Sequence, residues 1–211
     1  MTILSVNKTR TFLDGRFLRP SFVDAVTSCD RIFDKENKMK NTTRNTRFLT
    51  QAAVIAALNT VLTYAQYLLW PESTSMAVQV RISEAMLVLA FFTPAAVPGM
   101  TLGCLLFNLT YAGTLPLDWL VGTLATFLAV EGMWLTRKIT VKGYPVLGML
   151  LPAVTNAILV GWELTAYIGE ASFWYNALFV ALGELIALFV VGTVLFYAIR
   201  SRKLDKKVFT L

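Results

Sequence analysis

The chain has 211 residues, of which 56% are hydrophobic and 15% charged, whereas soluble domains average about 45–50% apolar and about 25% charged residues. It contains no histidine and two cysteines, which excludes a Ser-His-Asp triad, histidine-ligated metals and a disulfide framework. We expect no metal site and no cofactor. The formal net charge of +6 does not indicate nucleic-acid binding, because the basic residues flank long apolar segments instead of forming one face. The composition predicts an integral membrane protein.

The N-terminal segment, residues 1–38, differs from the rest of the chain. It is polar and contains no apolar stretch of the kind that a signal peptide needs. We interpret it as a flexible cytoplasmic extension, with Met39 as an alternative translation start. A cytoplasmic regulatory segment is the other interpretation. Residues 39–211 are then the membrane domain.

Six apolar segments follow. About 20 residues suffice for a helix to cross the hydrocarbon layer, and uninterrupted apolar runs without a period of two predict helices and not a barrel. The second and third segments are shorter, and Pro94, Pro98 and Gly99 predict a tight helical hairpin there. The fold class is therefore an all-α membrane protein with six transmembrane helices. The predicted helices are 48–70, 84–97, 98–112, 118–134, 146–167 and 174–199.

The distribution of charge predicts the orientation of these helices. Ten Lys and Arg residues lie in residues 1–47, three in 137–142 and five in 200–211. An even number of crossings brings these cations to one side of the membrane, and the positive-inside rule identifies that side as the cytoplasm. We therefore expect both termini in the cytoplasm and Arg81 outside.

Polar side chains within the predicted helices indicate a candidate binding site, because a carboxylate at the bilayer centre costs roughly 2.5–3.5 kcal/mol on insertion scales. Arg81 and Glu84 are three residues apart and share a helix face. They form either a local ion pair or an orienting pair at the mouth of an outward-facing site. Glu184 has no cation within one turn, so it is protonated, paired across the bundle or in contact with a ligand.

The fifth segment adds a second polar face. Asn156 and Glu163 are seven residues apart, and Trp162 precedes Glu163. This face suits a planar ligand, although a hydrogen bond between helices is the alternative. Asp118 is interpreted as complementing the dipole of its helix, with ligand contact as the alternative. The candidate substrate-binding residues are Arg81, Glu84, Asn108, Asn156, Trp162, Glu163 and Glu184.

Small residues repeat every four positions on the first segment. Ala52 and Ala56 form one pair, and Ala53 and Ala57 form another. Gly99 and Gly103 repeat the spacing in the third segment. Such stripes let the backbones of membrane helices approach closely. They serve either packing within the bundle or contact with an external helical partner, and the spacing alone leaves both open.

Several stretches resemble the QueT family, the substrate-binding S components of energy-coupling factor (ECF) transporters assigned to queuosine precursors. The resemblance covers residues 40–203, and VQVRISEA is its most specific part. The stretches are VQVRISEA at 78–85, PAAVPG at 94–99, GC at 103–104, GTLAT at 122–126, PAVTNAILVG at 152–161 and LGELI at 182–186.

The resemblance implies a six-helix S component in the plasma membrane of a prokaryote. Such a protein captures a 7-deazaguanine base such as preQ1, preQ0 or queuine outside the cell. Its partners are the membrane coupling protein EcfT and two EcfA-type ATPases, and the alanine stripe resembles the surface that S components present to EcfT. The chain itself has no GxxxxGK[ST] loop and is not expected to be an enzyme.

The residue types suit such a base. A carboxylate can accept the adjacent N1–H and 2-amino donors of a 7-deazaguanine, an asparagine can pair with its ring acceptors, and Trp162 could stack on its face. If the ligand carries an aminomethyl cation, a second carboxylate would balance it. The alternatives are an S component for another vitamin or purine-like compound, a solitary proton-coupled carrier and a small membrane enzyme.

Overall fold

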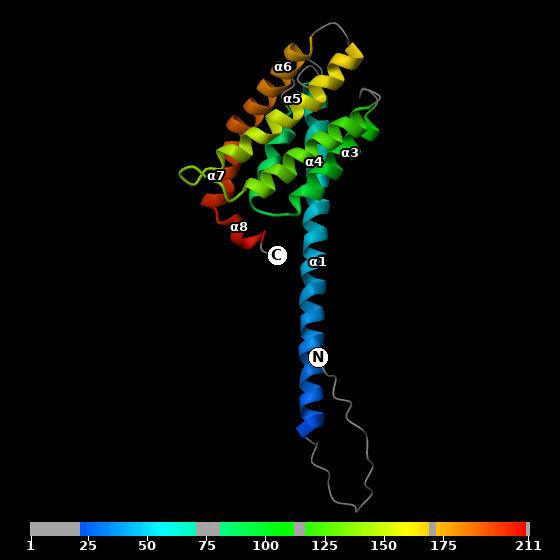
Figure 1. The fold of residues 1–211 in the computed structure, drawn as a ribbon, viewed down its shortest axis with the longest axis vertical. Helices are drawn as coiled ribbons and strands as arrows, with labels where there is room; N and C mark the ends of the chain where they lie inside the picture. The colour runs from blue at the N-terminus through cyan, green and yellow to red at the C-terminus, as the bar shows by residue number, and fades with distance from the viewer. Residues whose placement is uncertain (1–21, 71–80, 112–116, 169–171, 210–211) are drawn as a thin grey trace, which may run out of the picture. The chain divides into compact units, whose positions relative to one another are not determined.

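The computed structural model describes residues 22–70, 81–111, 117–168 and 172–209, with side chains from residue 42 on. Within these ranges the chain is helical, apart from an isolated bridge between Val141 and Tyr144. Figure 1 shows the elements in chain order. They are α1 (Phe22–Leu69), η1 (Ile82–Phe91), α3 (Ala96–Thr110), α4 (Asp118–Thr136), α5 (Val146–Ile168), α6 (Phe173–Ile186), η2 (Ala187–Gly192), α7 (Thr193–Ser201) and α8 (Leu204–Lys207).

The chain divides into two compact units, Met1–Thr43 and Arg44–Leu211. The described part of the first unit is the beginning of α1, which is helical from Phe22. Residues 22–38, expected to be a flexible extension, are therefore helical, and residues 1–21 lie outside the described residues. The two units meet between Thr43 and Arg44, and the division of the chain at residue 38 stays a prediction.

The second unit is a bundle in which successive helices reverse direction, with α6, η2 and α7 continuing as one helix (Figure 1). Neighbours in sequence pack together in the pairs α3–α4, α4–α5 and α5–α6. The η1 segment packs against α3, α4, η2 and α7, and its residues from Ser83 to Ala90 are all buried. An apolar segment that is buried on all sides forms the interior of the bundle. This places η1 at its centre.

Four helices of the described chain are long and apolar enough to cross a membrane: Thr42–Leu69, Asp118–Thr136, Val146–Tyr167 and Phe173–Ser201. The expected hairpin is shorter. Ten residues of 3₁₀-helix in η1 span about 20 Å at about 2 Å each, against about 30 Å of hydrocarbon. Length alone therefore supports four of the six predicted crossings.

The hairpin also reverses earlier than expected. The sequence predicts a break at residue 98, but η1 ends at Phe91 and α3 begins at Ala96. Pro98 lies in the first turn of α3, where the missing N–H of proline removes no helical hydrogen bond. The prediction was wrong because a proline in the first turn starts a helix instead of ending the previous one.

Two irregular helices face each other inside the bundle. The η1 segment is a 3₁₀-helix and η2 is a π-helix, and they pack together. A Cβ on Gly192 of η2 would lie 3.0 Å from Val88 Cγ2 of η1, so the glycine permits this close approach. Long 3₁₀ segments and π turns are uncommon and concentrate at functional positions.

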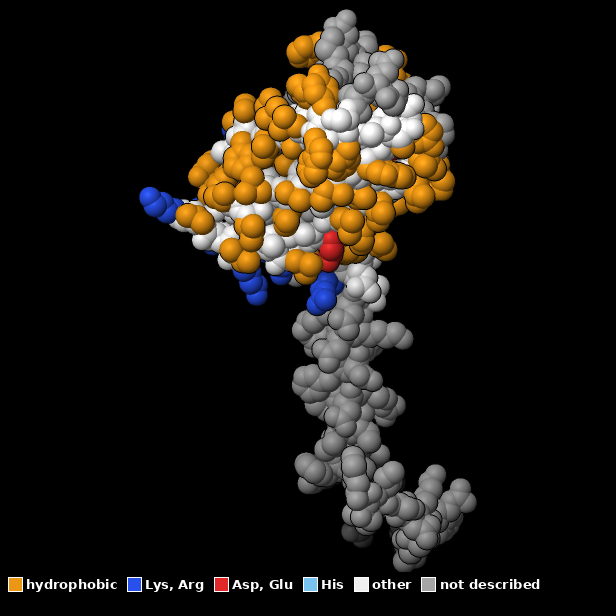
Figure 2. All heavy atoms as spheres, turned by 45° about the horizontal axis from the view of Figure 1, so that its top comes forward, with side chains coloured by type: hydrophobic (Ala, Val, Ile, Leu, Met, Phe, Trp, Pro, Cys, Tyr) orange, Lys and Arg blue, Asp and Glu red, His pale blue; other side chains and the backbone are white. Residues whose placement is uncertain are grey.

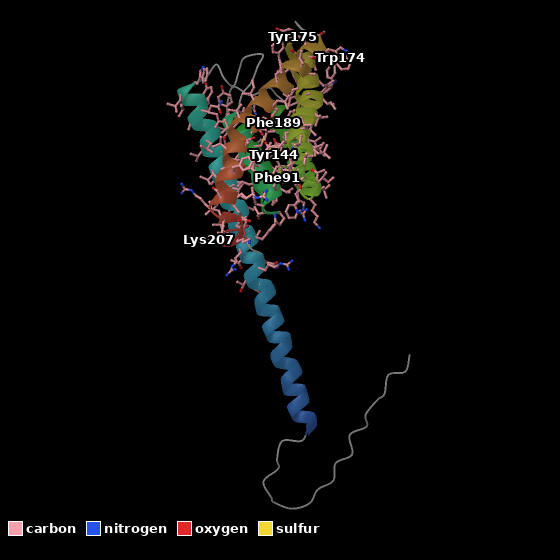
Figure 3. The ribbon with its side chains drawn as sticks, turned by 90° about the vertical axis from the view of Figure 1, so that its left-hand side faces the viewer. Phe91, Tyr144, Trp174, Tyr175, Phe189 and Lys207 are labelled. Carbon is pink, nitrogen blue, oxygen red and sulfur yellow. The ribbon has the colours of Figure 1, made fainter. Side chains whose placement is uncertain are left out.

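The described cations of the bundle other than Arg81 gather at one end, which we call the basic end (Figure 2). Arg200 donates to the Gly143 carbonyl at 2.6 Å, and Gln51 donates to the Val208 carbonyl at 2.7 Å. These bonds join the start of the bundle, the α4–α5 loop and the C-terminal segment. Figure 3 shows Lys207 at this end and Trp174 with Tyr175 at the opposite, far end. The described cations of the basic end are Arg44, Arg47, Arg137, Lys138, Lys142, Arg200, Arg202, Lys203, Lys206 and Lys207.

The apolar core fills the half of the bundle near the basic end. Leu87, Val88, Met133, Met149 and Leu188 are 0% exposed and belong to one packed cluster. Aromatic rings extend the cluster: Figure 3 shows Phe91, Tyr144 and Phe189 within this half. The core fixes the basic-end halves of the helices and leaves the polar side chains to the other half.

Small residues join α3 to α1. A Cβ on Gly103 would lie 2.8 Å from the Ala56 carbonyl oxygen, and one on Gly99 would lie 2.9 Å from the Ala52 carbonyl oxygen. Ala52 and Ala56 are accordingly buried, whereas Ala53 and Ala57 are exposed. One alanine pair serves packing within the bundle, and the other faces outward.

The contact between α3 and α1 predicts a stability effect. Gly103→Ala should lower the unfolding free energy by roughly 1–3 kcal/mol, because the added methyl group meets backbone that cannot move aside. The midpoint of thermal unfolding in detergent measures it. Gly132→Ala is the matched control, since its Cβ would meet only the end of the flexible Leu151 side chain at 3.0 Å. Equal midpoints for the two variants would contradict the α1–α3 packing.

Candidate functional site

Polar side chains from η1, α4, α5 and α6 meet around one small cavity, the acidic cavity. Its volume is about 30 Å³. Glu84 comes from the first turn of η1, Asp118 from the first turn of α4, Asn156 from the middle of α5 and Glu184 from the last turn of α6. The cavity is lined by Arg81, Glu84, Asp118, Gly122, Asn156, Val160, Val180 and Glu184.

Two carboxylates of the acidic cavity have an oxygen without a protein partner. Glu84 and Glu184 are each only 8% exposed, and the Oε2 atom of each is buried without a hydrogen bond. Asn156 Nδ2 donates to Glu184 Oε1, which orients that carboxylate and leaves Oε2 unpaired. A buried acceptor without a donor is costly, so these two oxygens can bind the donors of a ligand.

Arg81 directly precedes η1 as its N-cap residue, with an extended backbone. The Glu84 N–H donates to the Arg81 carbonyl at 3.0 Å, which ties the two residues together. The guanidinium is within electrostatic reach of Glu84, Asp118 and Glu184. One formal positive charge thus faces three formal negative charges, an excess that favours a cationic group in the cavity.

Asn108 does not line the acidic cavity but supports its wall. Its Nδ2 atom donates to the Asp118 carbonyl at 2.9 Å and contacts Cys104 Sγ at 3.5 Å. A Cβ on Gly122 would lie 2.9 Å from the same Nδ2 atom. The absence of a side chain at Gly122 therefore lets α3 hold the start of α4.

Glu163 lies beyond the acidic cavity on the same face of α5. Asn156 and Val160 line the cavity, and Glu163 follows Val160 by three residues, which keeps it on that face. Its side chain is 0% exposed, and neither carboxylate oxygen has a hydrogen bond.

Trp162 lies away from these residues. It is 54% exposed on the outer surface of α5, because the next residue along a helix points about 100° away. The structure therefore does not bring it to the cavity. Figure 3 shows Trp174 and Tyr175 at the far end, and Trp162 belongs with them among the exposed aromatic side chains, which suit a membrane interface.

A second, smaller cavity adjoins the first and shares Arg81 and Glu84 with it. Its volume is about 10 Å³, and it adds Phe107 as a buried aromatic side chain with a ring centroid 4.9 Å from that of Tyr64. Asn59 and Thr63 are the α1 residues of this cavity. The spacing of such polar residues within the apolar part of α1 was the sequence signal that could have revealed them. The second cavity is lined by Asn59, Thr63, Arg81, Ser83, Glu84, Cys104 and Phe107.

The cavity residues provide carboxylates and amides but no described group of three Cys, Asp or Glu residues arranged to hold a metal ion. Asp118, Phe107 and the α1 residues Asn59 and Thr63 were not among the predicted site residues.

Comparison with protein families identifies the family of the chain. A family model described as QueT transporter matches residues 49–201, a range that includes each element lining the acidic cavity. No curated protein and no solved structure matches the chain. The match confirms the resemblance drawn from the sequence, and with most of the chain covered, this is a membrane protein that belongs to the QueT transporter family.

Proposed function

We propose that the chain is the substrate-binding S component of an ECF transporter and captures a queuosine precursor from outside the cell for ATP-driven uptake. Membership of the QueT transporter family supports transport. The acidic cavity supplies a binding site for a planar polar base. The energy for uptake would come from EcfT and two EcfA-type ATPases in the plasma membrane of a prokaryote.

The single observation that carries the proposal is the pair of unpaired oxygens in the acidic cavity, Oε2 of Glu84 and Oε2 of Glu184. A 7-deazaguanine base presents N1–H and a 2-amino group side by side. Hydrogen bonds from these donors to buried carboxylates are charge-assisted and strong. An aminomethyl substituent, as in preQ1, would add a cation to a cavity with an excess of carboxylates.

Binding of a base requires the acidic cavity to enlarge. Its volume of about 30 Å³ is close to the share of one water molecule in the liquid, far less than a bicyclic ring needs. Arg81 is the longest side chain of the lining and belongs to both cavities. Its withdrawal would open the largest space and join the two cavities on either side of Glu84.

In this proposal the bundle crosses the membrane six times, with both termini in the cytoplasm. The alternating direction of the elements supports it (Figure 1), as does the gathering of described cations at the basic end. The short hairpin of η1 and α3 would complete the six crossings, with η1 shielded from lipid by its neighbours. The acidic cavity would then lie in the outer half of the membrane.

Reconstitution into liposomes tests the proposal. The purified chain alone should bind preQ1 without transporting it, and uptake should begin only when EcfT, both ATPases and ATP are added. Transport by the chain alone would instead identify a solitary carrier. Tight binding of riboflavin or folate, with no binding of preQ0, preQ1 or queuine, would identify an S component for a different compound.

A further inference from the structure

A third, larger cavity lies at the basic end of the bundle, and we call it the basic-end cavity. Its volume is about 450 Å³, which falls within the range of small-molecule binding sites. It is enclosed by α1 where the bundle begins, the turn between η1 and α3, the end of α4 and the C-terminal segment. The lining side chains that matter for its chemistry are Arg44, Asn45, Phe48, Phe92, Trp134 and Phe209.

Four aromatic rings form the walls of the basic-end cavity, and all four are half-buried. Contacts elsewhere in the bundle hold them in place. The ring centroid of Phe92 lies 5.3 Å from that of Phe196, and Phe209 stacks on Phe92 at 6.4 Å. The hydrogen bond from Gln51 to the Val208 carbonyl fixes the chain beside Phe209. The wall is therefore preformed, and it suits the apolar part of a ligand.

The polar side of the basic-end cavity carries positive charge. Arg44 and Asn45 are exposed there and offer N–H donors. Arg137 covers the indole ring of the wall, with its Cζ atom 3.4 Å from the ring centroid, and brings a second guanidinium beside the cavity. In the described segments of the basic end, ten cations face two carboxylates, Glu131 and Asp205. This balance favours an anion, and a guanidinium can donate two parallel hydrogen bonds to a phosphate group.

The surface beside the basic-end cavity favours a phospholipid over a free phosphate ion. Leu49 follows Phe48 in α1 and is 65% exposed, and Leu135 follows Trp134 in α4 and is 67% exposed. Both helices are long and apolar enough to cross the membrane, and their basic ends lie at the level of the lipid headgroups. Positive charge, aromatic rings and exposed leucines are thus available to the headgroup, the glycerol backbone and the acyl chains of one lipid.

We propose that the basic-end cavity binds the phosphate headgroup of an anionic phospholipid. Arg44 and Asn45 donate to the phosphate oxygens, the glycerol backbone packs against the aromatic walls, and the acyl chains follow the apolar surfaces of α1 and α4. Basic pockets between membrane helices recognise lipid headgroups through the same combination of charge and shape. The binding requires no ligand in the acidic cavity and no partner protein, so it is independent of the proposed function.

Trp134 provides a fluorescent probe in the wall of the basic-end cavity. The full chain has five tryptophans, and a variant with phenylalanine at Trp70, Trp119, Trp162 and Trp174 keeps Trp134 alone. Its emission is measured in mixed bilayers of phosphatidylcholine and phosphatidylglycerol, with quenching bromine atoms first on one lipid and then on the other. We expect phosphatidylglycerol to be preferred about fivefold at this position, as one guanidinium near the membrane surface can provide.

Matched variants separate the cavity from the general charge of the basic end. Arg44→Gln should abolish the preference for phosphatidylglycerol at Trp134. Arg202→Gln removes the same charge from an exposed position of the same end outside the cavity and should keep the preference. A chain with Trp162 as its single tryptophan, on the outer surface of α5, should show similar quenching by both lipids.

A second measurement needs no replaced tryptophan. Native mass spectrometry of the wild-type protein, released from bilayers of the same two lipids, should show one retained phosphatidylglycerol molecule. Arg44→Gln should lose this lipid, and Arg202→Gln should keep it. Millimolar inorganic phosphate should not displace it, because a free ion gains nothing from the aromatic walls or the leucines.

Four results would overturn the proposal. Equal quenching of Trp134 by the two lipids would show that the cavity does not recognise an anionic headgroup. Equal losses in Arg44→Gln and Arg202→Gln would show that diffuse surface charge attracts the lipid. Displacement by inorganic phosphate would identify a site for the free ion. A wild-type protein that retains no phosphatidylglycerol would exclude the lipid site even if the single-tryptophan variant did not fold.

Discussion

Glu184→Gln should lower the affinity for preQ1 by about 100-fold, equivalent to about 2.7 kcal/mol. Asn156 orients this carboxylate through Oε1, and the unpaired Oε2 faces the acidic cavity. Glutamine keeps the shape but replaces one acceptor oxygen by a donor and removes the charge. A ligand donor would then face an N–H group in a buried site. The charge-assisted hydrogen bond would be lost, and the ligand donor would be left without an acceptor. Equilibrium binding to the purified protein measures the loss.

The matched control for Glu184→Gln is Glu131→Gln, which makes the same chemical change outside the acidic cavity. It should leave the dissociation constant within about twofold of the wild-type value, as expected for a site without ligand contact. Unchanged affinity in a folded Glu184→Gln protein would exclude Glu184 from the binding site and remove the main support for the proposed base contacts.

The double variant Ala53→Leu/Ala57→Leu should still bind preQ1, but the rate of uptake by the complete transporter should fall at least about tenfold. Both alanines are exposed on α1, four residues apart, so they offer a flat strip to an adjoining membrane helix. Two leucines would hold the helices apart, and overpacking of this kind typically costs roughly 1–3 kcal/mol. Uptake in reconstituted liposomes, measured beside binding to the chain alone, separates the two effects.

Two single variants, one at an exposed position and one at a buried position of α1, serve as controls for the double variant. Val54→Leu adds bulk at a side chain that is already 52% exposed and large, so uptake should change little. Ala56→Leu enlarges the buried contact with Gly103 and should instead lower stability and binding together. If the double variant transports at the wild-type rate, the exposed strip does not contact EcfT.

The sequence predicted the four long helices well, because length and uninterrupted apolar composition are strong signals in a membrane protein. It did not predict the 3₁₀ form of η1 or the π turn of η2. The two segments pack against each other, and Gly192 of η2 permits the close approach to η1. Composition does not encode that contact. The start of α1 was likewise missed, because a polar helix has no apolar period that would distinguish it from an extension.

For the site, carboxylates within apolar segments were an effective signal, since the structure brings Glu84, Asn156 and Glu184 to one cavity. Trp162 was selected for its neighbour in sequence, but adjacent residues of a helix face different directions. Asp118 was assigned to the helix dipole because its position at a helix start gave a sufficient local explanation. Its contact with the cavity depends on how α4 packs, which a single sequence does not specify.

The 3₁₀ form of η1 has a mechanical consequence. The same ten residues wound as an α-helix would be about 5 Å shorter, because the rise falls from about 2.0 to about 1.5 Å per residue. Rewinding from the end held in the core would draw Glu84 and the preceding Arg81 inward, and the two side chains, three residues apart, would still share a helix face. A change of η1 between these two helical forms would therefore change the depth of Glu84 and Arg81 within the bundle.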